Sequence, residues 1–109
     1  MFDQITIIGC GLIGSSIFKA LKKKSSIKKI ITFDNNKSAM EVIKKDNLSD
    51  KIVSSSAEAV KNSDLVLIST PSSSFGSVIK EIKESLKNGS ILTDTLSVKK
   101  GFEVKLDEV

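Results

Sequence analysis

The sequence predicts an α/β fold in which helices cover both faces of a doubly wound parallel sheet, giving three αβα layers. Short apolar runs alternate with longer amphipathic stretches at a spacing of roughly 25 residues, which is typical of successive βα units. The most apolar run, residues 64–69, has an unbroken apolar centre, as expected of a strand covered on both faces. The connections between these runs are long enough for parallel pairing.

The first βαβ unit occupies the first third of the chain. Residues 5–8 form an apolar run that predicts a buried strand. Apolar residues then recur at the spacing of one helical face between Ile13 and Leu21, so residues 12–24 predict a helix. Residues 30–33 predict the second strand.

The next segment is less regular. Residues 38–45 have one apolar face and predict a helix. Residues 51–53 predict a short third strand, and residues 57–61 predict a brief helix preceded by three serines that are good caps.

The second half of the chain repeats the βα pattern. After the strand predicted at residues 64–69, an apolar face from Phe75 to Leu86 predicts the longest helix. Gly89 ends it, because glycine readily adopts the left-handed conformation that follows a helix. Residues 90–94 predict a fifth strand.

The net charge of +4 raises the question of nucleic-acid binding. All 17 basic residues are lysine, whereas base readout and phosphate clamping favour arginine. The five aromatic residues are all Phe, so few rings are present for base stacking. We therefore expect no nucleic-acid partner.

The remaining composition indicates a reduced compartment. Cys10 is the only cysteine, so no disulfide forms within the chain. No apolar run is long enough to span a membrane, and the N-terminus lacks the basic segment of a secretory signal. We expect a cytoplasmic protein with no membrane partner and no metal site.

A glycine-rich turn follows the first strand. The turn fits the pattern G-x-G-x-x-G and lies between a strand and a helix of one βαβ unit, which is the context of a Rossmann-type dinucleotide site. Gly9 makes the tight turn, Gly11 lets the backbone approach a pyrophosphate, and Gly14 lets the helix pack close to the sheet. The start of the helix offers N–H groups to the phosphates. The cofactor-binding residues predicted here are Gly9, Cys10, Gly11, Leu12, Ile13 and Gly14.

An acidic residue follows the second strand at the expected distance. Asp34 is 20 residues beyond Gly14 (34 minus 14), where the carboxylate that binds the adenosine ribose is expected. Asp34 would repel the 2′-phosphate of NADP, and the sequence has no arginine to accommodate that group. We therefore predict NAD rather than NADP as the cofactor, with Lys37 as the residue that argues for NADP.

Structural roles are the alternatives for these residues. Asp34 is placed to cap the following helix, the glycines are suited to packing without a ligand, and Cys10 is suited to filling the turn as a small side chain.

Three blocks of the sequence resemble the prephenate and arogenate dehydrogenases of tyrosine synthesis. The blocks are residues 8–16, 64–71 and 93–99, in the order and spacing of that family. The first two blocks are shared with related NAD(P) enzymes, and the third, which contains Ser97-Val98-Lys99, is the most specific.

The resemblance implies an NAD-linked oxidative decarboxylation of prephenate or arogenate, in which hydride passes to the nicotinamide. By resemblance, Thr70 and Pro71 border the nicotinamide half of the cofactor, and Ser69 beside them joins the cofactor site. The alternative is a strand end followed by serine caps. Ser97 matches the family serine that hydrogen-bonds the substrate, and its alternative role is to cap the last helix.

The sequence also departs from the family. The residue before the family serine is usually glycine but here is Leu96, so the loop departs from the family pattern at this position. The family's general base is a histidine about twenty residues beyond the third block, and an arginine grips the substrate carboxylates. The 109 residues contain neither histidine nor arginine.

We therefore expect residues 1–109 to form one Rossmann domain, truncated at its C-terminus and without the helical domain through which the family forms homodimers. A helical pattern with Phe102, Leu106 and Val109 begins after Ser97 and has no terminator. The chain is expected to bind NAD without catalysing a reaction. The alternatives are the cofactor domain of a 6-phosphogluconate or hydroxyacid type of dehydrogenase or reductase, and a stand-alone NAD-binding module.

Overall fold

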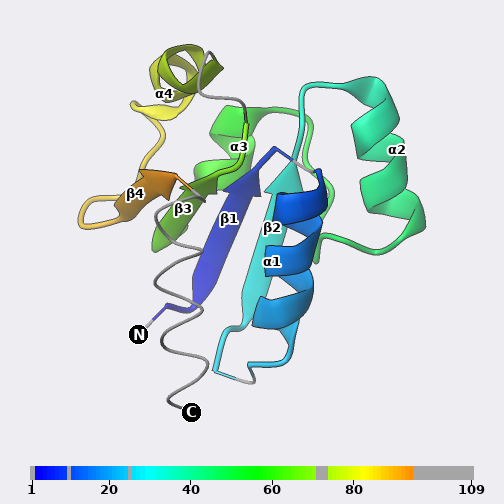
Figure 1. Ribbon diagram of the computed structural model, residues 1–109. Helices are drawn as coiled ribbons and strands as arrows, with labels where there is room; N and C mark the ends of the chain where they lie inside the picture. Colours follow the sequence, from blue (N-terminus) through cyan, green and yellow to red (C-terminus); the bar gives the residue numbers. More distant parts are fainter. Residues whose placement is uncertain (1, 10, 25, 71–73, 95–109) are drawn as a thin grey trace.

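The computed structural model describes residues 2–9, 11–24, 26–70 and 74–94, and within them four strands form one parallel sheet (Figure 1). The order across the sheet is β2-β1-β3-β4. The strands are β1 (Gln4–Ile8), β2 (Lys29–Phe33), β3 (Leu65–Ile68) and β4 (Ile91–Asp94). Each lies within one residue of its predicted ends, and the predicted doubly wound α/β fold is confirmed.

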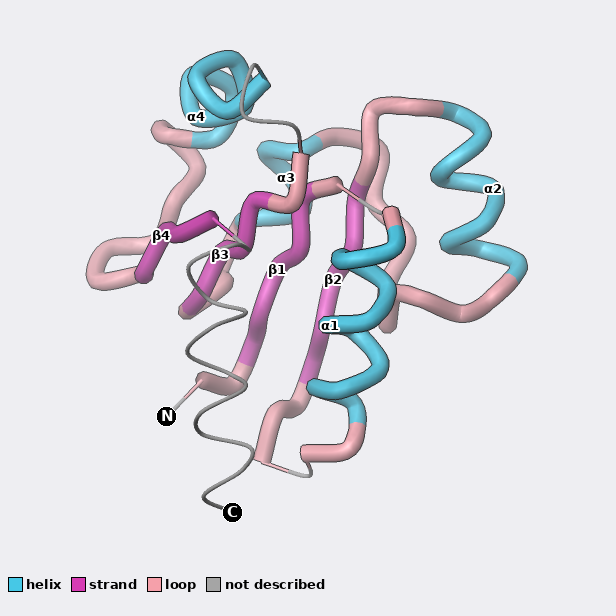
Figure 2. Tube along the Cα trace, in the orientation of Figure 1, coloured by secondary structure: helices cyan, strands magenta, loops and turns pink. Residues whose placement is uncertain are grey.

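The strand side chains point alternately to the two faces, so the core has two halves. One half lies under α1 (Leu12–Lys22) and contains Ile7 of β1 and Leu67 of β3. The other lies under α3 (Ser56–Val60) and α4 (Phe75–Ile82) and contains the intervening strand residues. Figure 2 shows the sheet between α1 and α3 in the same orientation. Helices therefore cover both faces, as the unbroken apolar strands require.

Helix α2 (Lys37–Lys45) follows β2 and lies beyond its outer edge (Figure 1). It begins because the Asn36 side chain accepts a hydrogen bond from the Ala39 backbone N–H at 3.1 Å. Its Ile43 is fully buried in the core half that contains α1. This buried contact fixes the helix beside the end of β2.

The short third strand predicted at residues 51–53 is wrong, because β2 is an edge strand of the described sheet. The preceding residues lie along that edge, but two of its backbone N–H groups are bound by side chains instead of by a strand. The N–H of Ile30 donates to the Asp50 carboxylate at 2.7 Å, and the N–H of Thr32 donates to the Ser49 hydroxyl at 2.8 Å. These bonds satisfy the edge and protect it from pairing with another chain.

Helix α4 ends at Ile82, earlier than the predicted face to Leu86. The Lys83 N–H still donates to the Ile79 oxygen four residues back, as in an α-helix. The Ser85 N–H instead donates to the Ile82 oxygen, only three residues back, which makes a tighter turn. Gly89 has a φ of +83° and stands in the turn before β4. The helix predicted after Ser97 lies outside the described residues. No helix in the described part of the chain is both long enough and apolar enough to cross a membrane.

Candidate functional site

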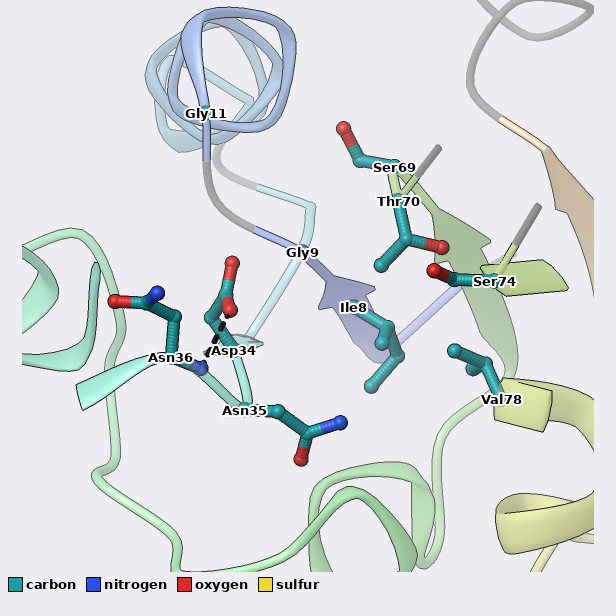
Figure 3. Close-up of a pocket in the computed structure, with 10 residues that line it drawn as sticks. All are labelled: Ile8, Gly9, Gly11, Asp34, Asn35, Asn36, Ser69, Thr70, Ser74 and Val78. Carbon is teal, nitrogen blue, oxygen red and sulfur yellow. Dashed lines mark hydrogen bonds between the residues drawn. The ribbon is translucent and has the colours of Figure 1, made fainter. Parts of the chain in front are cut away.

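A pocket of about 540 Å³ opens at the carboxyl ends of β1, β2 and β3 (Figure 3). The chain leaves β1 for α1 on one face of the sheet and leaves β3 for α4 on the other. Ligands of open α/β sheets bind at such a divergence. The lining residues are Ile8, Gly9, Gly11, Asp34, Asn35, Asn36, Ser69, Thr70, Ser74 and Val78.

Two glycines allow the tight turn between β1 and α1. Gly9 has a φ of +98°, and a Cβ on it would lie 2.9 Å from the Thr70 Cγ2 atom. A Cβ on Gly14 would lie 2.5 Å from the backbone oxygen of Gly9. Any other residue at 14 would therefore push the start of α1 away from the end of β1.

Gly11 differs from both because no described protein atom requires a glycine there. Its φ of −143° is extended backbone, and a Cβ on it would meet nothing within 4 Å. The position lines the pocket, so the missing side chain leaves room for a ligand to approach the backbone.

The start of α1 is suited to an anion. Gly11 is the N-cap and supplies no side-chain hydrogen bond, and the first turn contains no acidic residue. Because the first N–H groups of a helix have no partner within it, they give this end a partial positive charge.

Asp34 lies directly after β2, at the opposite wall of the pocket. Its Oδ1 atom accepts a hydrogen bond from the Asn36 N–H at 2.8 Å (Figure 3). Its own backbone N–H donates to the Met40 sulfur at 3.3 Å. The alternative role as a helix cap is wrong, because Asn36 caps α2.

The third wall comes from the end of β3. The Ser69 N–H donates to the backbone oxygen of Ile8 at 2.7 Å, which holds this strand end against β1. The Thr70 hydroxyl is buried and has no hydrogen-bond partner among the described residues. A buried hydroxyl without a partner costs about 1–3 kcal/mol, so this atom is a ready contact for a polar ligand.

A second hollow of about 600 Å³ shares Asp34 and Asn35 with the first. Its wall includes Ile52, whose side chain is partly exposed, and Met40. The two hollows together suit an elongated ligand with a polar group beside Asp34.

Glu58 holds the loop that forms one side of this second hollow. Its carboxylate accepts hydrogen bonds from the N–H and the hydroxyl of Ser54, at 3.1 and 3.0 Å. These bonds, the backbone one first, hold the pKa of Glu58 below its usual value. The carboxylate therefore stays charged and keeps the loop in place at neutral pH.

The structure brings five predicted site residues into the pocket and leaves others out. Gly9, Gly11, Asp34, Ser69 and Thr70 line it.

Gly14 does not line the pocket and instead lets α1 pack against the end of β1. The Leu12 side chain is 86% exposed and does not line the pocket, while Ile13 packs on the core half that contains α1. The backbone of both residues lies in the first turn of α1. Cys10, Pro71 and Ser97 lie outside the described residues.

Sequence reasoning missed Ser74 and Val78 of the far wall and Asn35 beside Asp34. Ser74 and Val78 follow a strand by several residues and carry no local motif, so only the sheet order shows that they face the glycine turn. Among the described residues, no group of three or more potential metal ligands occurs.

The sequence is similar to a known family of dehydrogenases. A family model described as prephenate dehydrogenase, nucleotide-binding domain, matches residues 17–109, which begin just after the glycine turn. Cyclohexadienyl dehydrogenase of Zymomonas mobilis is 34% identical over 99 residues, covering 91% of this chain and 34% of that protein.

Solved structures agree in fold. The prephenate dehydrogenase of A. aeolicus, crystallised with hydroxyphenyl propionate and NAD+, has a TM-score of 0.75 at 24% identity, over 86% of this chain and 33% of that one. The arogenate dehydrogenase of Synechocystis has a TM-score of 0.73 at 21% identity, over 84% and 32%. The chain thus spans about a third of the length of these relatives.

Proposed function

The chain belongs to the prephenate dehydrogenase family as its nucleotide-binding domain, and we propose that it binds NAD across the two hollows at the carboxyl end of the sheet. The observation that carries the proposal is the position of Asp34, which lines both hollows opposite the glycine turn. The pyrophosphate is proposed to lie at Gly11 and the start of α1, where room and N–H groups are both present. The Asp34 carboxylate is proposed to bind the ribose hydroxyls.

The pocket residues fit the two ends of the cofactor. We assign the adenine to the second hollow, because Ile52 and Met40 offer apolar surface there. We assign the nicotinamide end to the side of Thr70 and Ser74, where the buried Thr70 hydroxyl lacks a protein partner among the described residues. The predicted roles of Cys10 and Pro71 in the same site remain proposals.

The charge of the second hollow supports NAD over NADP. Lys37 and Lys44 line it, but so do the carboxylates of Asp34, Glu41 and Glu58. A 2′-phosphate would enter beside the Asp34 carboxylate and be repelled by it, whereas a ribose hydroxyl donates to it.

For the whole protein we propose oxidative decarboxylation of prephenate or arogenate. When bound, NAD supplies the hydride acceptor for this chemistry. The residues of this domain hold and orient the cofactor, and Ser97 is proposed to hydrogen-bond the substrate. Because these 109 residues contain neither histidine nor arginine, the general base and the carboxylate anchor are proposed to come from other segments or another chain. A homodimer is proposed to form through those segments as well.

Calorimetry with NAD and NADP tests the cofactor assignment. The unmodified chain is expected to bind NAD more tightly. Asp34→Asn is expected to weaken NAD binding roughly tenfold to a hundredfold, since hydrogen bonds to a charged group are lost, while NADP binding improves. The fold should persist because an amide oxygen can still accept from Asn36 N.

Asp46→Asn is the matched control, because it removes the same charge at the other end of α2. Its NAD affinity should equal that of the unmodified chain. Tighter binding of NADP by the unmodified chain, or an equal loss of affinity in both variants, contradicts the assignment.

A further inference from the structure

Three backbone N–H groups along the outer edge of β2 and directly after its end are bound by side chains. Those of Ile30, Thr32 and Asp34 donate to Asp50, Ser49 and Met40, at 2.7, 2.8 and 3.3 Å. The acceptor changes along the strand from a carboxylate to a hydroxyl to a thioether sulfur. Sulfur is the weakest acceptor of the three. The weakest bond of this edge therefore holds the residue at the pocket.

The Met40 side chain is placed firmly enough to hold Asp34. It is partly buried and packs against both halves of the core, at the edge where they meet. Its own N–H donates to the Asn36 backbone oxygen at 3.0 Å. The Asn36 N–H in turn donates to the Asp34 carboxylate. The N-cap and the first turn of α2 therefore hold both the side chain and the backbone of Asp34.

We propose that Met40 is a positioning residue that sets the preference for NAD over NADP by fixing the backbone of Asp34. The proposal rests on the proposed function of the pocket. A carboxylate distinguishes a ribose hydroxyl from a phosphate only while it keeps a fixed position beside the sugar. Without the sulfur contact, the Asp34 carboxylate is less restrained. It then binds the ribose less well and repels a 2′-phosphate less strongly.

Lys37 and Lys44 make the expected effects on NAD affinity and NADP affinity unequal. Both line the hollow that contains Asp34 and Met40. When the Asp34 carboxylate is displaced, these two cations remain and balance the carboxylates of Glu41 and Glu58, so the charge of the hollow no longer opposes a 2′-phosphate. Loss of the Met40 contact should therefore lower the affinity for NAD and leave the affinity for NADP unchanged or higher.

Three variants of the 109-residue chain separate positioning from packing. Met40→Leu keeps the approximate volume but removes the acceptor, while Met40→Gln keeps the length and offers a carbonyl oxygen. Ile43→Val is the matched control, because it removes a buried methyl from the same helix without touching Asp34. Calorimetry with NAD and with NADP gives the ratio of the two dissociation constants for each variant.

In Met40→Leu, the dissociation constant for NAD is expected to rise about fivefold, as for the loss of one neutral hydrogen bond, with no rise for NADP. Met40→Gln should keep the ratio of the unmodified chain. Ile43→Val should lower the melting temperature and keep the ratio. Equal effects on NAD and NADP in Met40→Leu, or the same change of ratio in Ile43→Val, overturn the proposal. If Met40→Leu does not fold, a lost preference in folded Met40→Gln overturns it.

Amide hydrogen exchange without cofactor provides a second readout. The Asp34 amide should exchange faster in Met40→Leu than in the unmodified chain or in Ile43→Val, and unchanged exchange overturns the proposal. An unmodified chain that binds no NAD would refute the proposed function itself. An unmodified chain that prefers NAD, with the same preference in Met40→Leu, refutes only the role of Met40.

Discussion

The polar groups at the two ends of the sheet differ in whether the protein supplies their hydrogen-bond partners. At the amino ends, the Asp64 carboxylate accepts hydrogen bonds from the N–H groups of Asp3 and Gln4, at 2.8 and 3.1 Å, and from the Lys87 ammonium. Asp50 likewise binds the Ile30 N–H and the Lys22 ammonium, both at 2.7 Å. The chain itself supplies the partners of both carboxylates.

At the carboxyl ends, one polar group that faces the pocket lacks a partner among the described residues. The Thr70 hydroxyl is buried without a partner among the described residues, and the space at Gly11 is open. Asp34 lines both hollows. Polar groups satisfied by the protein stabilise the fold, whereas an unsatisfied group that lines a pocket is available to a ligand.

The largest expected effect comes from Gly14, which lets the start of α1 pack against the carboxyl end of β1. Gly14→Ala places a Cβ against the Gly9 backbone oxygen, so the turn must open. We expect it to lower the free energy of unfolding by about 3 kcal/mol and to abolish NAD binding. Urea unfolding and calorimetry measure the two effects.

Gly11→Ala is the matched control in the same turn, because its Cβ meets no described atom. It should unfold like the unmodified chain but bind NAD more weakly. A Gly14→Ala protein of unchanged stability would show that the close approach of α1 to β1 is not required.

Thr70→Val is expected to change the stability of the fold and the affinity for NAD in opposite directions. Replacing the buried, unpartnered hydroxyl with a methyl group should raise the free energy of unfolding by about 1 kcal/mol. NAD binding should weaken, since the hydroxyl is proposed to contact the cofactor. Thermal unfolding and calorimetry on the same preparation test this, and a destabilised variant with unchanged affinity would contradict it.

The smallest effect is expected at the amino end and depends on pH. The hydrogen bond from Lys87, followed by the Gln4 and Asp3 N–H groups, lowers the pKa of Asp64 from 3.8 to about 2. Because the folded pKa is the lower one, this carboxylate stabilises the fold fully above 3.8, and the contribution is lost as the pH falls through about 2.

Asp64→Asn should therefore be less stable than the unmodified chain at neutral pH, and the difference should shrink across that acid window. NAD affinity should not change. Denaturant unfolding at a series of pH values measures the difference, and Lys87→Met should raise the lower end of the window. A pH-independent difference would show that the Asp64 charge contributes nothing.

The parts predicted from the sequence are those with local signals. The four strands are continuous apolar runs. The glycine turn and Asp34 follow adjacent parallel strands of one βαβ unit, so their spacing in the sequence is enough to predict that they face each other. The family assignment, based on three short blocks, is confirmed by the family match.

The parts not predicted depend on contacts between distant segments. The composition of residues 51–53 predicts a third strand, but the N–H groups of the β2 edge donate to the Ser49 and Asp50 side chains instead. The burial of the Thr70 hydroxyl depends on how β3 lies beside β1. The contact between Met40 and the Asp34 N–H depends on how α2 folds back on β2. None of these has a signal within one segment.

The most direct test is an NMR titration of the 15N-labelled chain with NAD. We expect the largest amide shifts at Gly9, Gly11, Asp34 and Thr70, with the amides of Asp50 and Asp64 at the other end unchanged. Shifts concentrated at the amino ends of the strands, or no shifts at a saturating concentration, would contradict the claim that the carboxyl end of this sheet holds the cofactor.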